Sequence, residues 1–308
     1  MRGLGAAGLA IASLFLFNTS CREDLPAEKP VYFQVDRLFL QTNYDQEGSA
    51  HNRITTAWLF INNEPVGAFE LPFTVPVLMP EGESDITIYP GVNLNGIQAI
   101  RAIYDAYEPI RLTRSKPEGA EEELDTIRFT QEELTTTYRP SYDIFIVEDF
   151  DQSGVNLEAL QGSDTAIIKV SDPDSVFSFT PVNQNNPEPN GKAGLITLQE
   201  DNTTAEFGSV AVYDLPPGLT NVYLEATYRS NVDIGFGLIA LLSTGQTRRL
   251  TTRVFPKEEW SMIHMDLITE YLAEPNATGY KIYITARKPS SVNEARIFLD
   301  NLKLCIRP

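Results

Sequence analysis

The sequence has few of the side chains that build disulfide frameworks or metal centres. Its 308 residues include two cysteines, Cys21 and Cys305, and two histidines, His51 and His264. A disulfide scaffold needs more cysteines than this, and so few histidines argue strongly against a His-rich zinc site. Cys305 lies in an apolar run, where a buried, unreactive thiol is expected.

Positive charge is also scarce. There are 24 Lys and Arg residues against 42 Asp and Glu, which gives a formal net charge of −18. No compact Lys/Arg block offsets this charge, so the surface should repel the phosphates of nucleic acids. Binding to DNA, to RNA or to anionic lipid through a basic patch is therefore not expected.

Motifs of enzyme active sites are missing too. The chain has no G-x-S-x-G elbow, phosphate-binding loop, dinucleotide-binding fingerprint or H-E-x-x-H pair. His264 alternates with Ile263 and Met265, so it should point away from the face that they share and play a structural part. We therefore predict no catalytic residues and no enzyme activity. Carboxylate pairs for glycoside hydrolysis stay open, because their separation and not their presence identifies them.

The N-terminus carries an export signal. Arg2 precedes an apolar stretch over residues 4–17, which has the length of a signal-peptide core and is too short to span a bilayer. The following Asn-Thr-Ser-Cys, residues 18–21, resembles the looser lipobox of Bacteroidetes lipoproteins, with Asn18 where Leu is usual. This resemblance implies a signal peptide over residues 1–20 and a lipidated, palmitate-bearing Cys21. The alternative is an ordinary signal peptide that is cut nearby.

The residues after Cys21 indicate where the protein would work. Residues 22–24, Arg-Glu-Asp, resemble the charged signal that directs Bacteroidetes lipoproteins to the cell surface. Residues 21–30 are predicted to form a tether, and no later stretch approaches the ~20 apolar residues of a membrane helix. We expect a chain that is lipid-anchored at the outer membrane or cell surface.

The remaining chain is dominated by short alternating segments that predict an all-β protein. Residues 31–141 are expected to form a sandwich similar in style to immunoglobulin-like or transthyretin-like modules, with a helix-like window at residues 98–107. Residues 142–308 contain about ten strand signals, including one at residues 207–213, and one helical turn at residues 268–273. This pattern predicts an antiparallel jelly roll of two packed sheets.

Three segments of the second domain resemble the galactose-binding-like jelly rolls of carbohydrate-binding modules. They are residues 222–228, residues 260–267 with Trp260 before an alternating strand, and residues 297–304. The similarity covers roughly residues 143–308 and marks fold better than function. It implies a structural Ca²⁺ held by Glu148, Asp149 and Asp300, whose carboxylates suit calcium. The alternative is that these side chains are a turn-side polar pair and solvated acids.

Together these features predict a non-catalytic binding or scaffold lipoprotein of the envelope, with a glycan as the expected ligand. One alternative is a structural accessory subunit of an envelope or secretion assembly that binds protein. A second is a subunit associated with a glycoside hydrolase.

Overall fold

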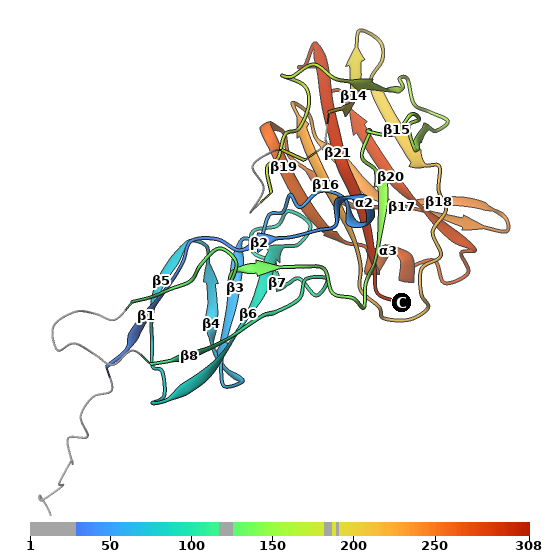
Figure 1. Cartoon of the computed structure of the whole chain (residues 1–308). Helices are drawn as coiled ribbons and strands as arrows, with labels where there is room; N and C mark the ends of the chain where they lie inside the picture. Colours follow the sequence, from blue (N-terminus) through green and yellow to red (C-terminus); the bar gives the residue numbers. More distant parts are fainter. Residues whose placement is uncertain (1–28, 117–125, 182–186, 189–190) are drawn as a thin grey trace, which may run out of the picture.

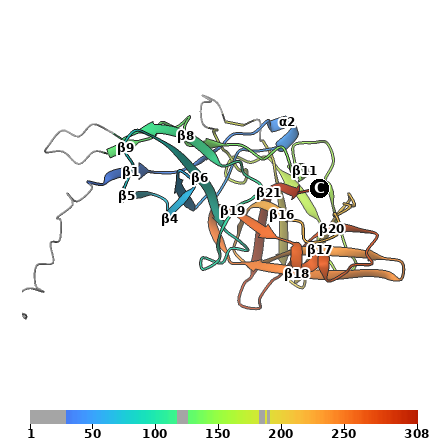
Figure 2. The ribbon, with the colours of Figure 1, turned by 90° about the horizontal axis from the view of Figure 1, so that it is seen from below.

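The chain folds into two β halves that lie side by side (Figure 1, Figure 2). The computed structural model describes residues 29–116, 126–181, 187–188 and 191–308. Cys21 and the predicted signal peptide lie outside these residues. Within them, no helix is long and apolar enough to cross a membrane.

The first half is a sandwich whose sheets share one apolar core. Alternation builds it: in β1 every second residue is buried, and Phe33 is fully buried at its centre. The side chains of Leu59 in β3 and Ile88 in β6 meet that face from the opposite sheet. The larger sheet runs β4 (Glu64–Glu70), β3 (Thr56–Ile61), β6 (Glu83–Asn93) and β7 (Arg101–Ile103), with β8 (Ile110–Ser115) also on β6. The smaller sheets are β5 (Phe73–Val77), β1 (Val31–Val35) and β9 (Thr126–Arg128), and the pair β10 (Thr135–Thr136) and β2 (Phe39–Leu40).

The second half consists of two sheets packed over a continuous apolar core, so the prediction of an all-β fold with a jelly roll is confirmed. One sheet runs β13 (Ile167–Val170), β14 (Ala193–Gln199), β21 (Glu294–Ile306), β16 (Val222–Ser230) and β19 (Lys257–Asp266), with β11 (Asp143–Glu148) also on β21. The other runs β12 (Leu157–Ala159), β15 (Thr204–Ser209), β20 (Gly279–Arg287), β17 (Ile234–Leu242) and β18 (Gly245–Val254).

Two predicted elements differ in the structure. The window at residues 98–107 is not helical: β7 pairs with β6 there, and Tyr104 and Tyr107 are fully buried between the two halves. The strand predicted at residues 207–213 lies earlier in the chain, as β15 (Thr204–Ser209). The predicted helical turn corresponds to α3 (Ile268–Leu272), while the short helix α2 (Tyr44–Glu47) has no counterpart among the predictions.

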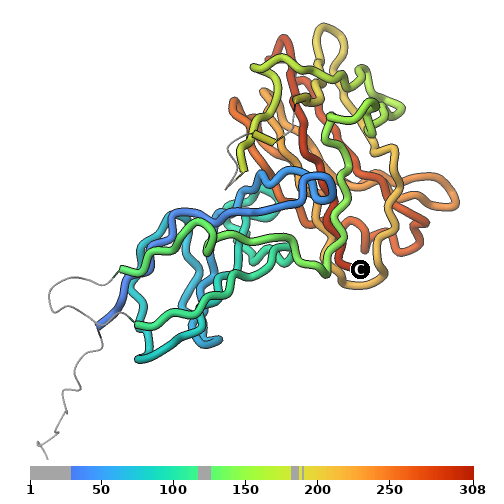
Figure 3. The backbone as a smooth tube through the Cα atoms, in the orientation of Figure 1, coloured from blue at the N-terminus to red at the C-terminus, as the bar shows by residue number. Residues whose placement is uncertain are grey.

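α2 belongs to an excursion of the first half, residues 41–55, which crosses onto the jelly roll (Figure 3). The helix ends at Gly48, whose φ of +71° favours glycine. A Cβ at this position would lie 3.3 Å from Cδ of Lys303 in β21. The excursion, together with the loops around Tyr104 and Tyr138, therefore covers the outer face of β16 and β21.

Under this cover lies a buried ion pair. Nζ of Lys303 and Oε2 of Glu225 are 3.4 Å apart, and the two side chains are 1% and 0% exposed. Glu225 also accepts hydrogen bonds from the hydroxyls of Tyr138, at 2.6 Å, and Tyr104, at 2.8 Å. Lys303 donates to the same Tyr138 hydroxyl at 2.6 Å and to the carbonyl of Ser49 at 2.9 Å. Both charged side chains of this pair thus form hydrogen bonds with groups from the first half.

Both histidines lie at this junction. His264 contacts Tyr107, with Nε2 3.1 Å from its hydroxyl, and Nδ1 of His51 lies 3.0 Å from Oγ1 of Thr227. Ile263 and Met265 point into the jelly-roll core, so the predicted orientation of His264 is confirmed. Burial lowers the pKa of His51 to about 3 and that of His264 to about 4.

We expect Lys303→Met to lower the free energy of unfolding by about 3–5 kcal/mol, because it leaves the Glu225 carboxylate buried without its cation. The double variant Glu225→Gln/Lys303→Met should lose less, since no buried charge is left. Urea denaturation measures both. Lys281→Met is the matched control, because its pair with Glu158 is partly exposed and should be worth at most about 1 kcal/mol. A double variant less stable than the single one would contradict this interpretation.

The two histidines also predict how stability depends on pH. In the unfolded chain a histidine has a pKa of about 6.5, so it takes up a proton below that pH while the buried ring in the folded chain stays neutral. The free energy of unfolding should therefore fall as the pH drops from about 6.5 to about 4, by up to about 1.4 kcal/mol per pH unit for each histidine. Urea denaturation at pH 7, 6 and 5 measures the slope. His264→Gln should have a shallower slope than the native chain, and equal slopes would count against buried neutral His264.

Candidate functional site

The three residues predicted to hold calcium do not form a ligand shell in the structure. Glu148 is fully buried, and its carboxylate accepts hydrogen bonds from the backbone N–H groups of Phe150, at 2.6 Å, and Asn156. Asp149 accepts one from the N–H of Asp151, and buried Asp300 accepts one from the N–H of its neighbour at 2.8 Å. The described residues contain no group of three or more His, Cys, Asp or Glu side chains arranged to hold a metal ion. Calcium here stays a prediction of the resemblance that these contacts do not favour.

Of the two cysteines, the structure describes one. Cys21 lies outside the described residues, so its lipidation stays a prediction. Cys305 is free and fully buried, as expected, and its Sγ lies 3.7 Å from Oε1 of Glu225. Burial raises the pKa of this thiol, which keeps it protonated and unreactive.

A candidate binding surface lies on the outer face of the sheet that contains β15, β20, β17 and β18. Strand alternation places Phe236 and Ile284 in the core, so the residues next to them face outward. Arg253, Gly235 and Thr285 are register partners across three neighbouring strands, and Glu206 continues the row on β15. These outward residues form a row of polar side chains interrupted by a glycine.

The glycines of β17 shape this face. A Cβ at Gly235 would lie 2.7 Å from Cδ1 of Leu250 and 2.8 Å from Cγ2 of Thr285, so its absence lets both neighbours lean inward. Gly237 adjoins a register shift, and a Cβ there would lie 1.9 Å from the carbonyl oxygen of Arg249. Close approach of the backbone at the bulge therefore requires glycine, in keeping with the role expected of glycine inside a strand.

A hollow of about 460 Å³ lies over this row. Glu206 forms an ion pair with Arg248, whose guanidinium lies 5.8 Å from the centre of the Tyr283 ring. The ring is only 6% exposed, so it supports the floor and offers no open stacking platform. The residues that line the hollow are Thr204, Glu206, Asp233, Arg248, Leu250, Arg253, Tyr283, Thr285, Ala286 and Arg287.

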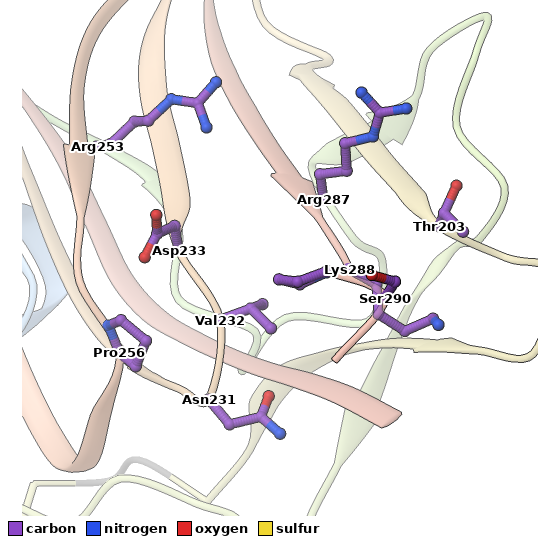
Figure 4. Close-up of a pocket in the computed structure, with 10 residues that line it drawn as sticks. Thr203, Asn231, Val232, Asp233, Arg253, Pro256, Arg287, Lys288 and Ser290 are labelled. Atoms are coloured by element: carbon purple, nitrogen blue, oxygen red, sulfur yellow. The ribbon is translucent and has the colours of Figure 1, made fainter. Parts of the chain in front are cut away.

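A second hollow, of about 780 Å³, adjoins the first at the end of the sheet and shares Asp233, Arg253 and Arg287 with it. Figure 4 shows Arg253 and Asp233 on one side of this space and Arg287 and Lys288 on the other. In the described part of the chain, neither arginine side chain makes a hydrogen bond or ion pair with protein. The two hollows together form an extended groove, the sheet groove, with two guanidinium groups available to a ligand.

Four tyrosines and the tryptophan of the jelly roll are packed against other side chains. Tyr213, Tyr223, Tyr228 and Tyr280 are each at most 8% exposed. Trp260 lies 5.6 Å from Phe177, measured between ring centres. The sheet groove was not among the sequence predictions, because the order of strands in a sheet decides which outward residues become neighbours. The sequence feature that belongs to it is the pair of glycines, Gly235 and Gly237, inside an apolar strand.

No protein-family model and no curated protein matches this sequence. Solved structures similar to it include a mutant family 29 carbohydrate-binding module complexed with cellulohexaose, at 11% identity and a TM-score of 0.32, covering 55% of this chain and 100% of that one. Another mutant of that module, complexed with mannohexaose, covers 53% and 92% at 11% identity and 0.31. The enzymatically active domain of bacteriophage CBA120 tailspike protein 4 covers 54% of this chain and 19% of its own at 10% identity and 0.32. Scores this low do not establish a common fold or a common ligand.

Proposed function

We propose that this chain is an exported lipoprotein, anchored through Cys21 at the outer membrane or cell surface, that binds a glycan in the sheet groove without transforming it. The observation that carries the glycan assignment is the groove itself, where hydroxyl, carboxylate and guanidinium groups converge from neighbouring strands. Ligand sites of proteins combine a preformed concave surface with a few polar groups that fix orientation.

The chemistry of the groove suits a polyhydroxylated ligand. The hydroxyls of Thr204 and Thr285 can donate and accept, the free guanidinium groups of Arg253 and Arg287 donate, and Asp233 accepts. A sugar presents hydroxyls that do both, so each of these groups can be satisfied at once. The apolar surface of Leu250, which is 40% exposed, supplies contact for the C–H face of a ring.

The pairing of the carboxylates in the groove favours a binding role over hydrolysis. Two acids, Glu206 and Asp233, line the groove. The carboxylate of Glu206 is held in an ion pair by Arg248. Glycoside hydrolysis uses two carboxylates that flank the scissile bond, and in the described groove one of the two is already paired with a guanidinium group.

The anchor assignment rests on the sequence around Cys21. Within the described residues the first strand, β1, starts at Val31, close to the end of the proposed tether over residues 21–30. The N-terminal edge of the first half would then be the part of the body nearest to the membrane.

We expect Arg287→Ala and Thr285→Val each to weaken glycan binding at least tenfold, about 1.4 kcal/mol, because each removes donors from the groove. A glycan array on the purified full chain would identify ligands, and calorimetry on the best of them would give the affinities. Arg111→Ala, an exposed arginine of the first half, is the matched control and should bind like the native chain. An array without any signal, or variants that bind normally, would refute the proposal.

Replacing Cys21 by Ala should abolish lipid attachment, because the thiol is the acceptor. Growth with labelled palmitate should label the native chain and not the variant, and the variant should leave the membrane fraction. Cys305→Ala is the control and should stay labelled, since its buried thiol takes no part. A labelled Cys21→Ala variant would overturn the anchor assignment.

A further inference from the structure

A separate cleft of about 360 Å³ lies at the junction of the two halves, on the side of the chain where the loop after β6 meets β18 and β19. The first half contributes Arg53, Thr55 and Asn93, and the jelly roll contributes Arg253, Phe255 and Lys257. The loop is fastened to the jelly roll by Asn95, whose Oδ1 accepts a hydrogen bond from the N–H of Asp266 at 3.0 Å. The cleft is therefore held in shape by a contact between the two halves.

The charge of this cleft is opposite to that of the protein. Arg53 and Lys257 line it, Arg253 stands at its border with the sheet groove, and none of the described residues that line it is acidic. The whole chain has a net charge of −18, so cations that meet in a cleft with no acid among its lining residues depart from the average surface. Like charges gathered in one cleft repel each other, and an anion bound between them would relieve that repulsion.

The cations are also available and partly preorganised. Nη1 of Arg53 donates to Oγ of Ser261, at 2.9 Å, and lies 3.4 Å from the carbonyl oxygen of Met262, which fixes the guanidinium across the junction. Among the described residues, the other N–H groups of Arg53 and the side chain of Lys257 have no hydrogen-bond or ion-pair partner. The cleft thus holds donors that no described residue satisfies.

Two further observations point to a ligand. Oγ1 of Thr55 is buried at the cleft and has no hydrogen-bond partner among the described residues, although buried hydroxyls are normally satisfied. Phe255 is 75% exposed beside the same cleft, so an aromatic wall stands next to the cations. A ligand with an oxyanion and a ring-sized body would use both.

From these contacts we infer that the junction cleft is a second binding site, which adjoins the sheet groove at Arg253 and takes a ligand bearing a carboxylate, sulfate or phosphate group. The oxyanion accepts hydrogen bonds from Arg53 and Lys257, and the body of the ligand packs against Phe255. The volume lies within the range of small-molecule sites, of about 300–1,000 Å³, and exceeds what a bare oxyanion fills. An acidic sugar unit fits this description, and a free inorganic oxyanion shares its charged part.

The test uses the purified full chain and three probes. Trigalacturonic acid carries carboxylates on sugar rings, its methyl ester lacks the charge, and sodium sulfate supplies the oxyanion alone. Calorimetry and thermal melting are recorded for the native chain, Arg53→Gln and Lys257→Gln. Lys257→Gln still tests the site if Arg53→Gln fails to fold, because the Lys257 side chain has no partner in the described structure. Arg296→Gln, in β21 and outside the residues that line the cleft, is the matched control, and Arg287→Ala separates this site from the sheet groove.

Trigalacturonic acid should bind, and Arg53→Gln and Lys257→Gln should each weaken it at least tenfold, while Arg296→Gln and Arg287→Ala should leave it unchanged. Affinity should fall with added salt, because the site is partly exposed. Stabilisation by sulfate alone, lost in the same two variants, would support the oxyanion site with an inorganic ligand. Equal binding of the methyl ester, no binding of any charged probe, or unaltered binding by both variants would overturn the inference. Because Arg287 of the sheet groove is varied separately, failure here leaves the proposed glycan site untouched.

Discussion

The buried pair of Lys303 and Glu225 is the interaction on which the arrangement of the two halves depends. Removing both charges from water costs several kcal/mol per ion, and their attraction offsets this cost only if the remaining hydrogen-bonding groups are also satisfied. The jelly roll alone does not satisfy them: Tyr104, Tyr138 and the carbonyl of Ser49 do so from the first half. Burial by itself would raise the pKa of Glu225, but Lys303 and the neighbouring donors outweigh it and lower that pKa. The carboxylate therefore stays charged. The jelly roll depends on the junction because the first half supplies the remaining hydrogen bonds of this buried pair.

This requirement explains why β16 and β21 are buried along almost their whole length. One face of each strand packs in the jelly-roll core, and the opposite face is covered by the first half. It also explains the position of the binding surfaces. The sheet that faces away from the junction keeps its outer face open, and the sheet groove and the junction cleft meet at Arg253, which lines both.

The sequence predicted those features that depend on local alternation. The period of two in residues 260–266 assigned His264 and its neighbours to opposite faces, and the apolar run around Cys305 indicated a buried thiol. Residues 98–107 resembled a helix because their tyrosines and apolar residues are spaced like one face of a helix, whereas long-range contacts with His264 and Tyr223 decide their conformation. No local pattern identifies Glu225 and Lys303 as partners, since their register depends on strands far apart in the sequence. The same limit hid the excursion at residues 41–55 and both binding surfaces.

The excursion has a consequence for how such a protein can evolve. Domains joined by a simple linker can be exchanged between proteins, because each keeps its own buried groups satisfied. Here a jelly roll transferred without residues 41–55 and Tyr138 would lose the groups that cover Lys303 and Glu225 and satisfy their hydrogen bonds. Joint inheritance of the two halves keeps these partners together.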